Sequence, residues 1–467
     1  MSGELVHFIG VGGTAMATLA AMLKARGYRV QGSDQGVYPP MSELLERERI
    51  RVFDGYAADH VTSDIDRVVV GNAISRGNVE LEEVLDRKIR YRSLPETIRE
   101  EFLWGARSVV IAGTHGKTTT TSMVGWLLTA GGLDPSVLVG GVAANFDTSY
   151  RLGAGRDFVI EGDEYDSAFF DKTAKFLKYL PDIAVVGNLE YDHADIYPDM
   201  ESLRVAFRRF LATVPRNGLA IIGADSPEAL KLAASARCAV ETFGLGPDAD
   251  WRASEIASTG SLCRFDVSFR QDRFGQFDVP LYGTHNVRNA LAALAVGRAV
   301  GLSPDSLRGA LAEFKGVRRR LELRGTVRDV SVYDDFAHHP TAIHETLAAM
   351  RAGHPDARLW AVFEPRSATA CRRVFQTDFA KAFVESGADE TILAPVFRST
   401  LPEAERLSVD ELASDITKSG RRARVLPTVD DIVATIAAEA RPGDRVVIMS
   451  NGGFGGIHGK LLDALAQ

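Results

Sequence analysis

The segment from Ser108 to Thr121 joins an apolar run to a turn whose residue types and spacing suit phosphate binding. It reads Ser-Val-Val-Ile-Ala-Gly-Thr-His-Gly-Lys-Thr-Thr-Thr-Thr. A glycine-bounded turn between a strand and a helix can aim several backbone N–H groups at an anion. Lys117 can reach the outer phosphates of a nucleotide, and the Thr118 hydroxyl is a suitable Mg²⁺ ligand.

This turn is shorter than the common phosphate-binding motif G-x-x-x-x-G-K-[ST]. Only Thr114 and His115 separate Gly113 from Gly116, which speaks against the ordinary ATPase and GTPase families. The alternative is a threonine-rich helix start after a buried strand. We interpret the turn as an ATP-binding loop that comprises Gly113, Thr114, His115, Gly116, Lys117, Thr118 and Thr119.

Two later strands are expected to deliver polar side chains to the same loop. The strand 157–161 ends at Glu161, and the strand 183–186 is followed closely by His193. Ligands of α/β sheets bind at the carboxyl ends of strands, and Mg²⁺ prefers oxygen ligands. We therefore predict Glu161 as a Mg²⁺ ligand with Thr118, and His193 as a ligand of a second metal ion. The alternatives are a solvated Glu161 and a His193 hydrogen-bonded to Asp192 or Asp195.

The N-terminal residues have the pattern of a Rossmann-like nucleotide site. A short strand, Leu5 to Ile9, is followed by a glycine turn, a helix from Met16 to Arg26 and a second strand from Tyr28 to Gln31. An acidic residue after that second strand suits the ribose of a nucleotide sugar as well as that of a dinucleotide. The alternative is a purely structural tight turn. The candidate binding residues are Gly10, Gly12, Gly13, Thr14, Ser33, Asp34 and Asn72.

A third group of polar residues stands at the start of an alanine-rich helix that continues to Val300. Asn286 and Asn289 are three residues apart, so they share a helical face. With His285 they can hydrogen-bond the base or the ribose of a nucleotide, although helix capping alone would explain Asn286.

Composition and charge exclude several classes of protein. The net charge is −8 and the pI is near 5.8, which argues against a general nucleic-acid-binding surface. The three cysteines are scattered without metal-site or disulfide spacing, as expected in a reducing cytoplasm. Because no signal segment or membrane-spanning run is apparent, we expect a soluble cytoplasmic protein without membrane insertion. The sequence does not indicate an oligomeric state.

Alternating strand and helix patterns predict an α/β protein of three domains. We expect a Rossmann-like N-terminal domain at 1–105, a central P-loop domain that binds ATP and Mg²⁺ at 106–315, and a Rossmann-like α/β domain at 316–467. Residues from about 240 to 280 show a less regular pattern. In the last domain, strands are expected near 330–333, 359–363, 390–393 and 445–449.

The ordered motifs resemble those of the Mur ligases, which are ATP-dependent amide-bond-forming enzymes of peptidoglycan synthesis. The resemblance extends over essentially the whole chain. It rests on the ATP-binding loop, Glu161 with its Asp-Glu-Tyr-Asp sequel, and the segments 188–193, 285–290, 314–322 and 334–340. At the position where later ligases of the pathway carry a carbamylated lysine, this chain has Phe207, which cannot bind a metal.

This resemblance implies that the first domain binds UDP-N-acetylmuramate and that the last domain closes over ATP. Arg319 or Arg320 would then stabilise the γ-phosphate, unless these arginines form a solvated hinge, and Asp334 or Asp335 would bind the ribose. Closure would exclude water from an acyl phosphate. The candidates for contacting an incoming peptide are His338, His339, Glu364, Arg366 and Asn451.

Four blocks resemble the recycling branch of the family, which joins the tripeptide L-alanyl-γ-D-glutamyl-meso-diaminopimelate to UDP-N-acetylmuramate. These blocks are 37–42, 165–172, 363–367 and 449–458. The alternative within the family is addition of L-alanine to the same nucleotide. A nicotinamide-dependent oxidoreductase and a non-catalytic ATP switch are the alternatives outside it.

Overall fold

The protein is described here by a computed structural model covering residues 3–38, 41–193, 196–397 and 400–467. The chain folds into two compact units. Unit 1 comprises Met1–Leu189, Glu201–Phe243 and Ala292–Ser303, and unit 2 comprises Glu190–Met200, Gly244–Leu291 and Pro304–Gln467. Asp195, a suggested partner of His193, and Pro39 and Pro40 of the block 37–42 lie outside the described residues.

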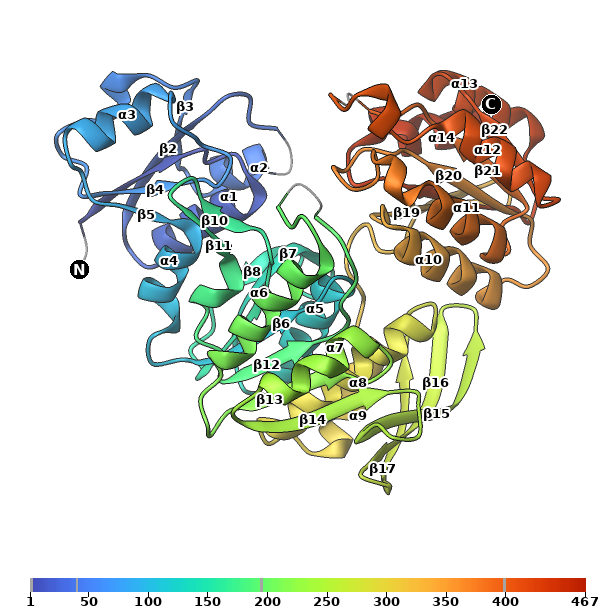
Figure 1. The fold of residues 1–467 in the computed structure, drawn as a ribbon, viewed down its shortest axis with the longest axis horizontal. Helices are drawn as coiled ribbons and strands as arrows, with labels where there is room; N and C mark the ends of the chain where they lie inside the picture. Colours follow the sequence, from blue (N-terminus) through green and yellow to red (C-terminus); the bar gives the residue numbers. More distant parts are fainter. Residues whose placement is uncertain (1–2, 39–40, 194–195, 398–399) are drawn as a thin grey trace. The chain divides into compact units, whose positions relative to one another are not determined.

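The N-terminal part of unit 1 is a five-stranded parallel sheet in the order β3-β2-β1-β4-β5, coloured blue in Figure 1. Its strands are β1 (Leu5–Ile9), β2 (Arg29–Asp34), β3 (Arg51–Asp54), β4 (Arg67–Val70) and β5 (Tyr91–Ser93). The accompanying helices are α1 (Thr14–Ala25), α2 (Met41–Arg47), α3 (Val79–Asp86) and α4 (Leu94–Ile98). The second strand extends further than the sequence predicted, so Ser33 and Asp34 are its last residues.

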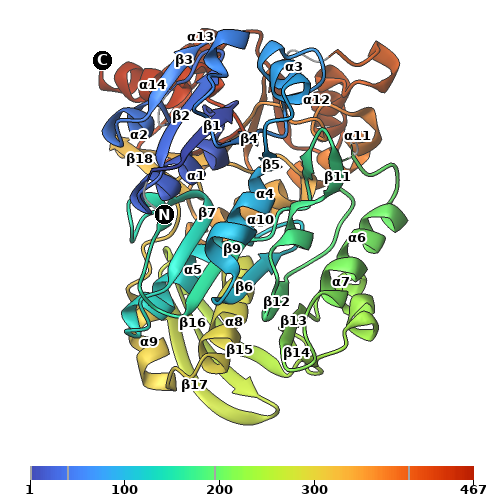
Figure 2. The ribbon, with the colours of Figure 1, turned by 90° about the vertical axis from the view of Figure 1, so that its left-hand side faces the viewer.

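The second sheet region of unit 1 contains the strands that carry the predicted ATP site. Its consecutive strands run in the order β14-β13-β12-β6-β9-β7-β8, and Figure 2 shows β7, β9, β6, β12 and β13 side by side. Only β8 is antiparallel to its neighbour within this run. The strands are β6 (Arg107–Ala112), β7 (Ser136–Ala143), β8 (Thr148–Arg151), β9 (Asp157–Glu161), β12 (Ile183–Val186), β13 (Leu219–Gly223) and β14 (Ala239–Gly244).

Helix α5 (Lys117–Ala130) follows β6 directly, as the sequence predicted. Two more helices, α6 (Met200–Ala212) and α7 (Pro227–Lys231), flank β13 in the sequence. In α6, Phe207 is fully buried and its ring packs edge-on against that of Phe176 at 5.1 Å. Hydrophobic packing therefore accounts for Phe207, which has no polar group to offer a ligand.

A short hairpin of unit 1, β10 (Asp166–Ala168) and β11 (Asp171–Ala174), joins the two sheet regions. Phe170 at its turn lies edge-on to Tyr91 of the first sheet at 5.1 Å, and Phe169 packs against the hydrophobic core of that sheet. Thr18 of α1 and Ser149 of β8 share a buried hydrogen bond of 2.9 Å. The aromatic contacts fix the hairpin against the first sheet, and the hydrogen bond links α1 to the second sheet region.

Unit 2 contains an antiparallel meander within the stretch, from about 240 to 280, that has a less regular sequence pattern. The strands are β15 (Trp251–Thr259), β16 (Leu262–Phe269) and β17 (Asp272–Val279). Cys263, Phe265 and Val267 are buried on one face of β16, with exposed or partly exposed residues between them. That period of two is the signature of a strand with one buried face, and we did not predict these strands from the sequence. Helices α8 (Thr284–Ala299) and α9 (Pro304–Ala312) follow.

The C-terminal part of unit 2 is a six-stranded sheet in the order β18-β19-β23-β20-β21-β22, parallel except for β18. Its strands are β18 (Glu322–Val327), β19 (Val330–Asp335), β20 (Leu359–Phe363), β21 (Glu390–Leu393), β22 (Arg422–Val425) and β23 (Arg445–Met449). One face packs on α10 (Pro340–Gly353), α11 (Gln376–Glu385) and α12 (Val409–Lys418), and the other on α13 (Val429–Glu439) and α14 (Ile457–Ala466).

No helix within the described residues is long and apolar enough to cross a bilayer.

Candidate functional site

The predicted phosphate-binding loop is a tight turn between β6 and α5 that needs glycine at two positions. Gly113 has φ of +131° and Gly116 has φ of +80°, both in the region that favours glycine. A Cβ atom on Gly113 would lie 3.0 Å from the backbone oxygen of Asn188. The close approach of the loop to the end of β12 therefore excludes a larger residue.

Asn188 holds the loop in shape from the neighbouring strand end. Its side-chain Oδ1 accepts a hydrogen bond of 2.8 Å from the backbone N–H of His115, and its Nδ2 donates to the His115 carbonyl at 3.2 Å. Its backbone oxygen accepts from Thr114 N at 3.1 Å. From the sequence we assigned Asn188 to the family motif 188–193, but we did not predict that it holds the loop in shape.

Lys117, the first residue of α5, is held at the loop by a buried carboxylate. Its Nζ lies 2.9 and 3.0 Å from the two oxygens of Glu164 and donates to the carbonyl of Gly113 at 2.7 Å. Burial lowers the pKa of Lys117, but the carboxylates of Glu164, Asp163 and Glu161 outweigh that effect and raise the pKa overall. The lysine is therefore a fixed cation whose partner, Glu164, was not among the predicted site residues.

Thr118 and Glu161 form the oxygen pair that was predicted to bind Mg²⁺. The Thr118 hydroxyl donates to Glu161 Oε1 at 3.0 Å, and the N–H of Gly140 donates to Oε2 at 2.8 Å. Burial raises the pKa of Glu161, although the nearby Lys117 charge opposes that shift. A partly buried carboxylate beside a hydroxyl is a donor set that suits a hard cation.

The predicted N-terminal site residues form two groups. In the first, Gly10, Gly12, Ser33 and Asp34 bond to one another: Gly12 N donates to Asp34 Oδ2 at 2.6 Å, and Gly10 N donates to the Ser33 carbonyl at 2.9 Å. The Ser33 hydroxyl donates to the buried carboxylate of Glu80. These interactions organise the turn between β1 and α1.

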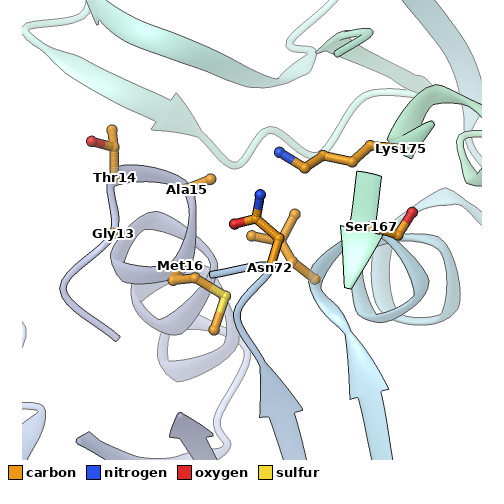
Figure 3. A pocket seen from close by; sticks show the side chains of 8 residues that line it. Gly13, Thr14, Ala15, Met16, Asn72, Ser167 and Lys175 are labelled. Atoms are coloured by element: carbon orange, nitrogen blue, oxygen red, sulfur yellow. The ribbon is translucent and has the colours of Figure 1, made fainter. Parts of the chain in front are cut away.

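The second group lines a cavity of about 120 Å³ in unit 1, shown in Figure 3. Three predicted residues, Gly13, Thr14 and Asn72, contribute to it. The sequence did not single out the remaining lining residues, which are Ala15, Met16, Leu94, Ser167 and Lys175. They come from α1, α4, β10 and the residue that follows β11, so their proximity depends on the fold.

In unit 2, the polar residues at the start of α8 contact one another as their spacing predicted. Asn289 Nδ2 donates to Asn286 Oδ1 at 3.0 Å, and Asn286 Nδ2 donates to the Tyr282 carbonyl at 2.8 Å. His285 Nδ1 lies 3.3 Å from a carboxylate oxygen of Glu345. Because Asn286 lies inside the first turn, after Thr284, it is not the residue that caps the helix.

Arg319 and Asp334 are joined at the beginning of the C-terminal sheet. Arg319 Nε lies 3.4 Å from Asp334 Oδ2, and its Nη2 donates to the carbonyls of Ser450 and Gly452, at 2.7 Å each. The guanidinium of Arg320 lies over the Phe336 ring at 5.1 Å. Desolvation would raise the pKa of Asp334, but its His458 and Arg319 neighbours lower the pKa overall.

The neighbouring Asp335, the other acid suggested for ribose binding, is also buried. Its two carboxylate oxygens accept hydrogen bonds of 2.7 Å from Leu321 N and Ala337 N. Burial raises its pKa above the usual value. Asp335 therefore fixes the backbone around β19.

The predicted peptide-contacting residues gather around the ends of β19, β20 and β23. Glu364 accepts from the Ser450 hydroxyl at 2.6 Å, and the guanidinium of Arg366 lies 3.8 Å from the centre of the Phe397 ring. Asn451 Oδ1 is buried and has no donor among the described residues. Such an orphaned acceptor marks a place where a ligand N–H can bind.

The two histidines His338 and His339 take different roles. His338 Nδ1 lies 2.9 Å from the carbonyl of Phe336. His339 is the N-cap residue of α10 and lies 3.6 Å from Glu190. Both therefore contribute to the local structure at the start of α10.

His193 lies in the loop that follows β12, and this part of the loop (Glu190–Met200) belongs to unit 2. It is buried, with φ of +56°, and its backbone N–H donates to Asp192 Oδ1 at 2.7 Å. Asp192 also accepts a hydrogen bond from Thr369, and the adjacent histidine charges lower its pKa despite burial. Its role as a metal ligand stays a prediction.

The fold and the loop are those of an α/β P-loop protein. Comparison with models of protein families shows which family it belongs to. The model "Mur ligase family, catalytic domain" matches residues 5–101, "Mur ligase middle domain" matches 111–297, and "Mur ligase, glutamate ligase domain" matches 319–452. The chain is 41% identical, over 99% of its length and 98% of the relative, to the UDP-N-acetylmuramate–L-alanyl-γ-D-glutamyl-meso-2,6-diaminoheptandioate ligase of Escherichia coli (strain K12). The chain belongs to the Mur ligase family of ATP-dependent, amide-bond-forming ligases, as its motifs predicted.

Solved structures agree with this assignment. A murein peptide ligase from Psychrobacter arcticus 273-4 is 38% identical, with a TM-score of 0.73 over 100% of this chain and 99% of the other. A UDP-N-acetylmuramate–alanine ligase from Thermotoga maritima is 22% identical, covers 98% of both chains and shares the fold, with a TM-score of 0.81. The predicted three-domain α/β fold is confirmed, whereas the predicted domain boundaries remain predictions.

Proposed function

We propose that this chain uses ATP to join the tripeptide L-alanyl-γ-D-glutamyl-meso-diaminopimelate to UDP-N-acetylmuramate. The observation that carries the proposal is the full-length similarity to the E. coli ligase of that name, together with a complete phosphate-binding loop. The Haemophilus influenzae ligase of the same name is 39% identical over 98% of this chain and 99% of its own length. Family membership sets aside the oxidoreductase and the ATP switch.

In the proposed reaction, the lactyl carboxylate of UDP-N-acetylmuramate attacks the γ-phosphorus of ATP, and ADP leaves. The amine of the tripeptide then attacks the acyl phosphate, and orthophosphate leaves as the amide forms. Lys117 stabilises the negative charge that shifts between the outer phosphates, because its amine is fixed beside the loop as a cation. Backbone N–H groups at the start of α5 bind the phosphates, with the helix N-terminus favouring their charge.

The oxygen pair of Thr118 and Glu161 fits a Mg²⁺ ion. These side chains already lie 3.0 Å apart, and the carboxylate keeps a second oxygen. When bound, Mg²⁺ would neutralise phosphate charge and polarise the γ-phosphoryl group. We assign the second metal ligand to His193, as predicted from sequence, because a neutral imidazole is a good ligand and Phe207 removes the carbamylated lysine used by other ligases.

Roles in nucleotide and peptide binding are also proposed for residues of unit 2. His285, Asn286 and Asn289 would contact the base or ribose, Asp334 the ribose, and Arg319 or Arg320 the γ-phosphate. Arg319 and Asp334 are already paired with each other, so ATP would replace or extend one existing ion pair. The peptide would contact His338, His339, Glu364, Arg366 and Asn451; the orphaned Oδ1 of Asn451 supports this assignment because it can accept a peptide N–H.

A second candidate is the addition of L-alanine to UDP-N-acetylmuramate. It is favoured by relatives such as the UDP-N-acetylmuramate–L-alanine ligase of Agrobacterium fabrum, which is 38% identical over 96% of this chain and 94% of its own length. The acceptor amine separates the two functions, since both activate the same carboxyl group.

The deciding experiment supplies the purified protein with ATP, Mg²⁺, UDP-N-acetylmuramate and either the tripeptide or L-alanine, and measures product mass. The proposal expects an ATP-dependent product with the tripeptide and a much slower reaction with L-alanine. Efficient use of L-alanine alone would establish the second candidate. A cytoplasmic role in recycling cell-wall peptides follows from the proposed substrates.

A further inference from the structure

Lys175 stands out in unit 1 because it lines the cavity beside the N-terminal turn while no predicted role involves it. It follows the hairpin strand β11 and begins the short helix η3 (Lys175–Lys178). Its side chain is only 14% exposed. Figure 3 shows its amine pointing toward Asn72 and the start of α1. A long cationic side chain is thus directed into a small cavity that polar and apolar side chains line together.

The position of Lys175 is fixed by several contacts. Its Nζ lies 3.0 Å from Asp163 Oδ2 and 5.6 Å from the centre of the Tyr165 ring, and its backbone N–H donates to the Tyr165 carbonyl at 2.9 Å. An ammonium group has three N–H donors, so one carboxylate partner does not exhaust it. The amine is therefore held in place and can still donate toward the cavity.

Asp163 and Glu164 are adjacent in sequence and hold two different lysines. Asp163 pairs with Lys175 at the cavity, and Glu164 pairs with Lys117 at the ATP loop. The segment 162–166 therefore supplies a carboxylate to the lysine at each place, and the charge of Asp163 also acts on Lys117. The lysine at the cavity and the lysine at the ATP loop are thus linked through adjacent residues of one segment.

The wall of the cavity opposite Lys175 is also suited to binding an anion. Helix α1 begins at Thr14, has Gly13 as its N-cap residue without a side-chain cap, and carries no acidic residue in its first turn. The first N–H groups of a helix have no partner within the helix, and the positive end of its dipole lies there. Thr14 and Ser167 add hydroxyl groups to the lining, and Asn72 adds an amide.

We propose that Lys175 binds the diphosphate of the nucleotide sugar, opposite the first turn of α1. This inference rests on the proposed function, which supplies a nucleotide sugar with two anionic groups. Of these, the lactyl carboxylate has to reach the γ-phosphate of ATP at Lys117. The diphosphate is therefore the group left for the cavity, where a lysine, a helix N-terminus and neutral polar side chains surround it.

The test measures dissociation constants by calorimetry for the intact protein with UDP-N-acetylmuramate and with UDP-N-acetylglucosamine, which retains the diphosphate but lacks the lactyl carboxylate. Loss of a charge-assisted hydrogen bond should make K175M weaker by about tenfold or more for both nucleotides. K175R should recover most of this loss. The matched control is K172M, because Lys172 lies on the same hairpin, pairs with Asp166 and is 67% exposed.

Thermal melting of each variant shows whether weaker binding reflects unfolding. Unchanged affinity in a folded K175M protein would overturn the inference. Weaker binding of UDP-N-acetylmuramate alone would assign Lys175 to the lactyl group and also overturn it. If the wild-type protein bound neither nucleotide, the proposed function would fail first, and this inference with it.

Discussion

Lys117 and Glu164 form a buried ion pair in which both carboxylate oxygens lie within 3.0 Å of the lysine amine. The pair keeps the lysine charged inside the ATP loop before any phosphate arrives. Removing one partner of a buried pair leaves the other without compensation, which typically costs about 3–5 kcal/mol. Variants of this pair can therefore separate the effect of Lys117 on stability from its effect on catalysis.

We expect K117M to lower the free energy of unfolding by about 3 kcal/mol, because Glu164 is left buried and unpaired. The double variant K117M/E164Q should recover most of that stability, since it removes the buried charge. Ligase activity should be lost in both, because neither has a cation at the phosphates. Urea unfolding and a phosphate-release assay measure the two effects. Activity in the double variant near the wild-type level would contradict the role of Lys117.

We expect the ionised Glu161 carboxylate to lower the stability of the fold while it supports activity. Burial raises its folded pKa, so ionisation destabilises the fold above the unfolded pKa of a glutamate. E161Q should therefore melt at a higher temperature than wild type at pH 7, and the difference should shrink as pH falls and Glu161 becomes protonated. Its Mg²⁺-dependent activity should fall by about a hundredfold or more. An E161Q protein with a normal Mg²⁺ response would refute the metal assignment.

Glu80 provides the opposite pH dependence in the N-terminal sheet. Burial would raise its pKa, but hydrogen bonds from His7, Ser33 and His60 outweigh burial and lower it. Its stabilising contribution is therefore present above the unfolded pKa of glutamate and is lost as pH falls through the lower folded pKa. E80Q should lose about 2 kcal/mol at pH 7 and progressively less in acid. Urea unfolding at several pH values tests this, and a constant difference would contradict it.

Gly113 tests whether the shape of the ATP loop matters. An alanine there would combine φ of +131° with a Cβ 3.0 Å from the Asn188 oxygen, so G113A should lose about 2 kcal/mol or more and bind ATP poorly. Gly187 is the matched control, because a Cβ atom there would lie no closer than 3.8 Å to the nearest atom. Equal ATP affinities for G113A and G187A would show that the loop tolerates the change.

The sequence predicted the parts of the fold and site that depend on local pattern. The strands 5–9, 67–70, 157–161, 183–186, 359–363, 390–393 and 445–449 have the predicted bounds, since apolar runs ending in glycine or polar residues mark buried parallel strands. The contact of Thr118 with Glu161 also followed from the rule that strand ends share one edge of a sheet.

Long-range pairings could not be predicted in this way. Ser33 and Glu80 are separated by 47 positions, and Lys117 and Glu164 also by 47, so no local periodicity connects them. Lys175 was missed because a lysine after a hairpin is ordinarily solvent-exposed, and its place in the cavity lining depends on the fold of the chain. The meander 251–279 was missed because irregularities that shift the pairing register between its strands interrupt the alternation of buried and exposed residues.

The central claim is that ATP activates the lactyl carboxyl of UDP-N-acetylmuramate for coupling to the tripeptide. The most direct measurement uses UDP-N-acetylmuramate labelled with ¹⁸O in that carboxyl and analyses the released orthophosphate by mass spectrometry. We predict one ¹⁸O atom in each orthophosphate molecule formed with the amide product. Unlabelled orthophosphate accompanying amide formation would contradict the acyl-phosphate route.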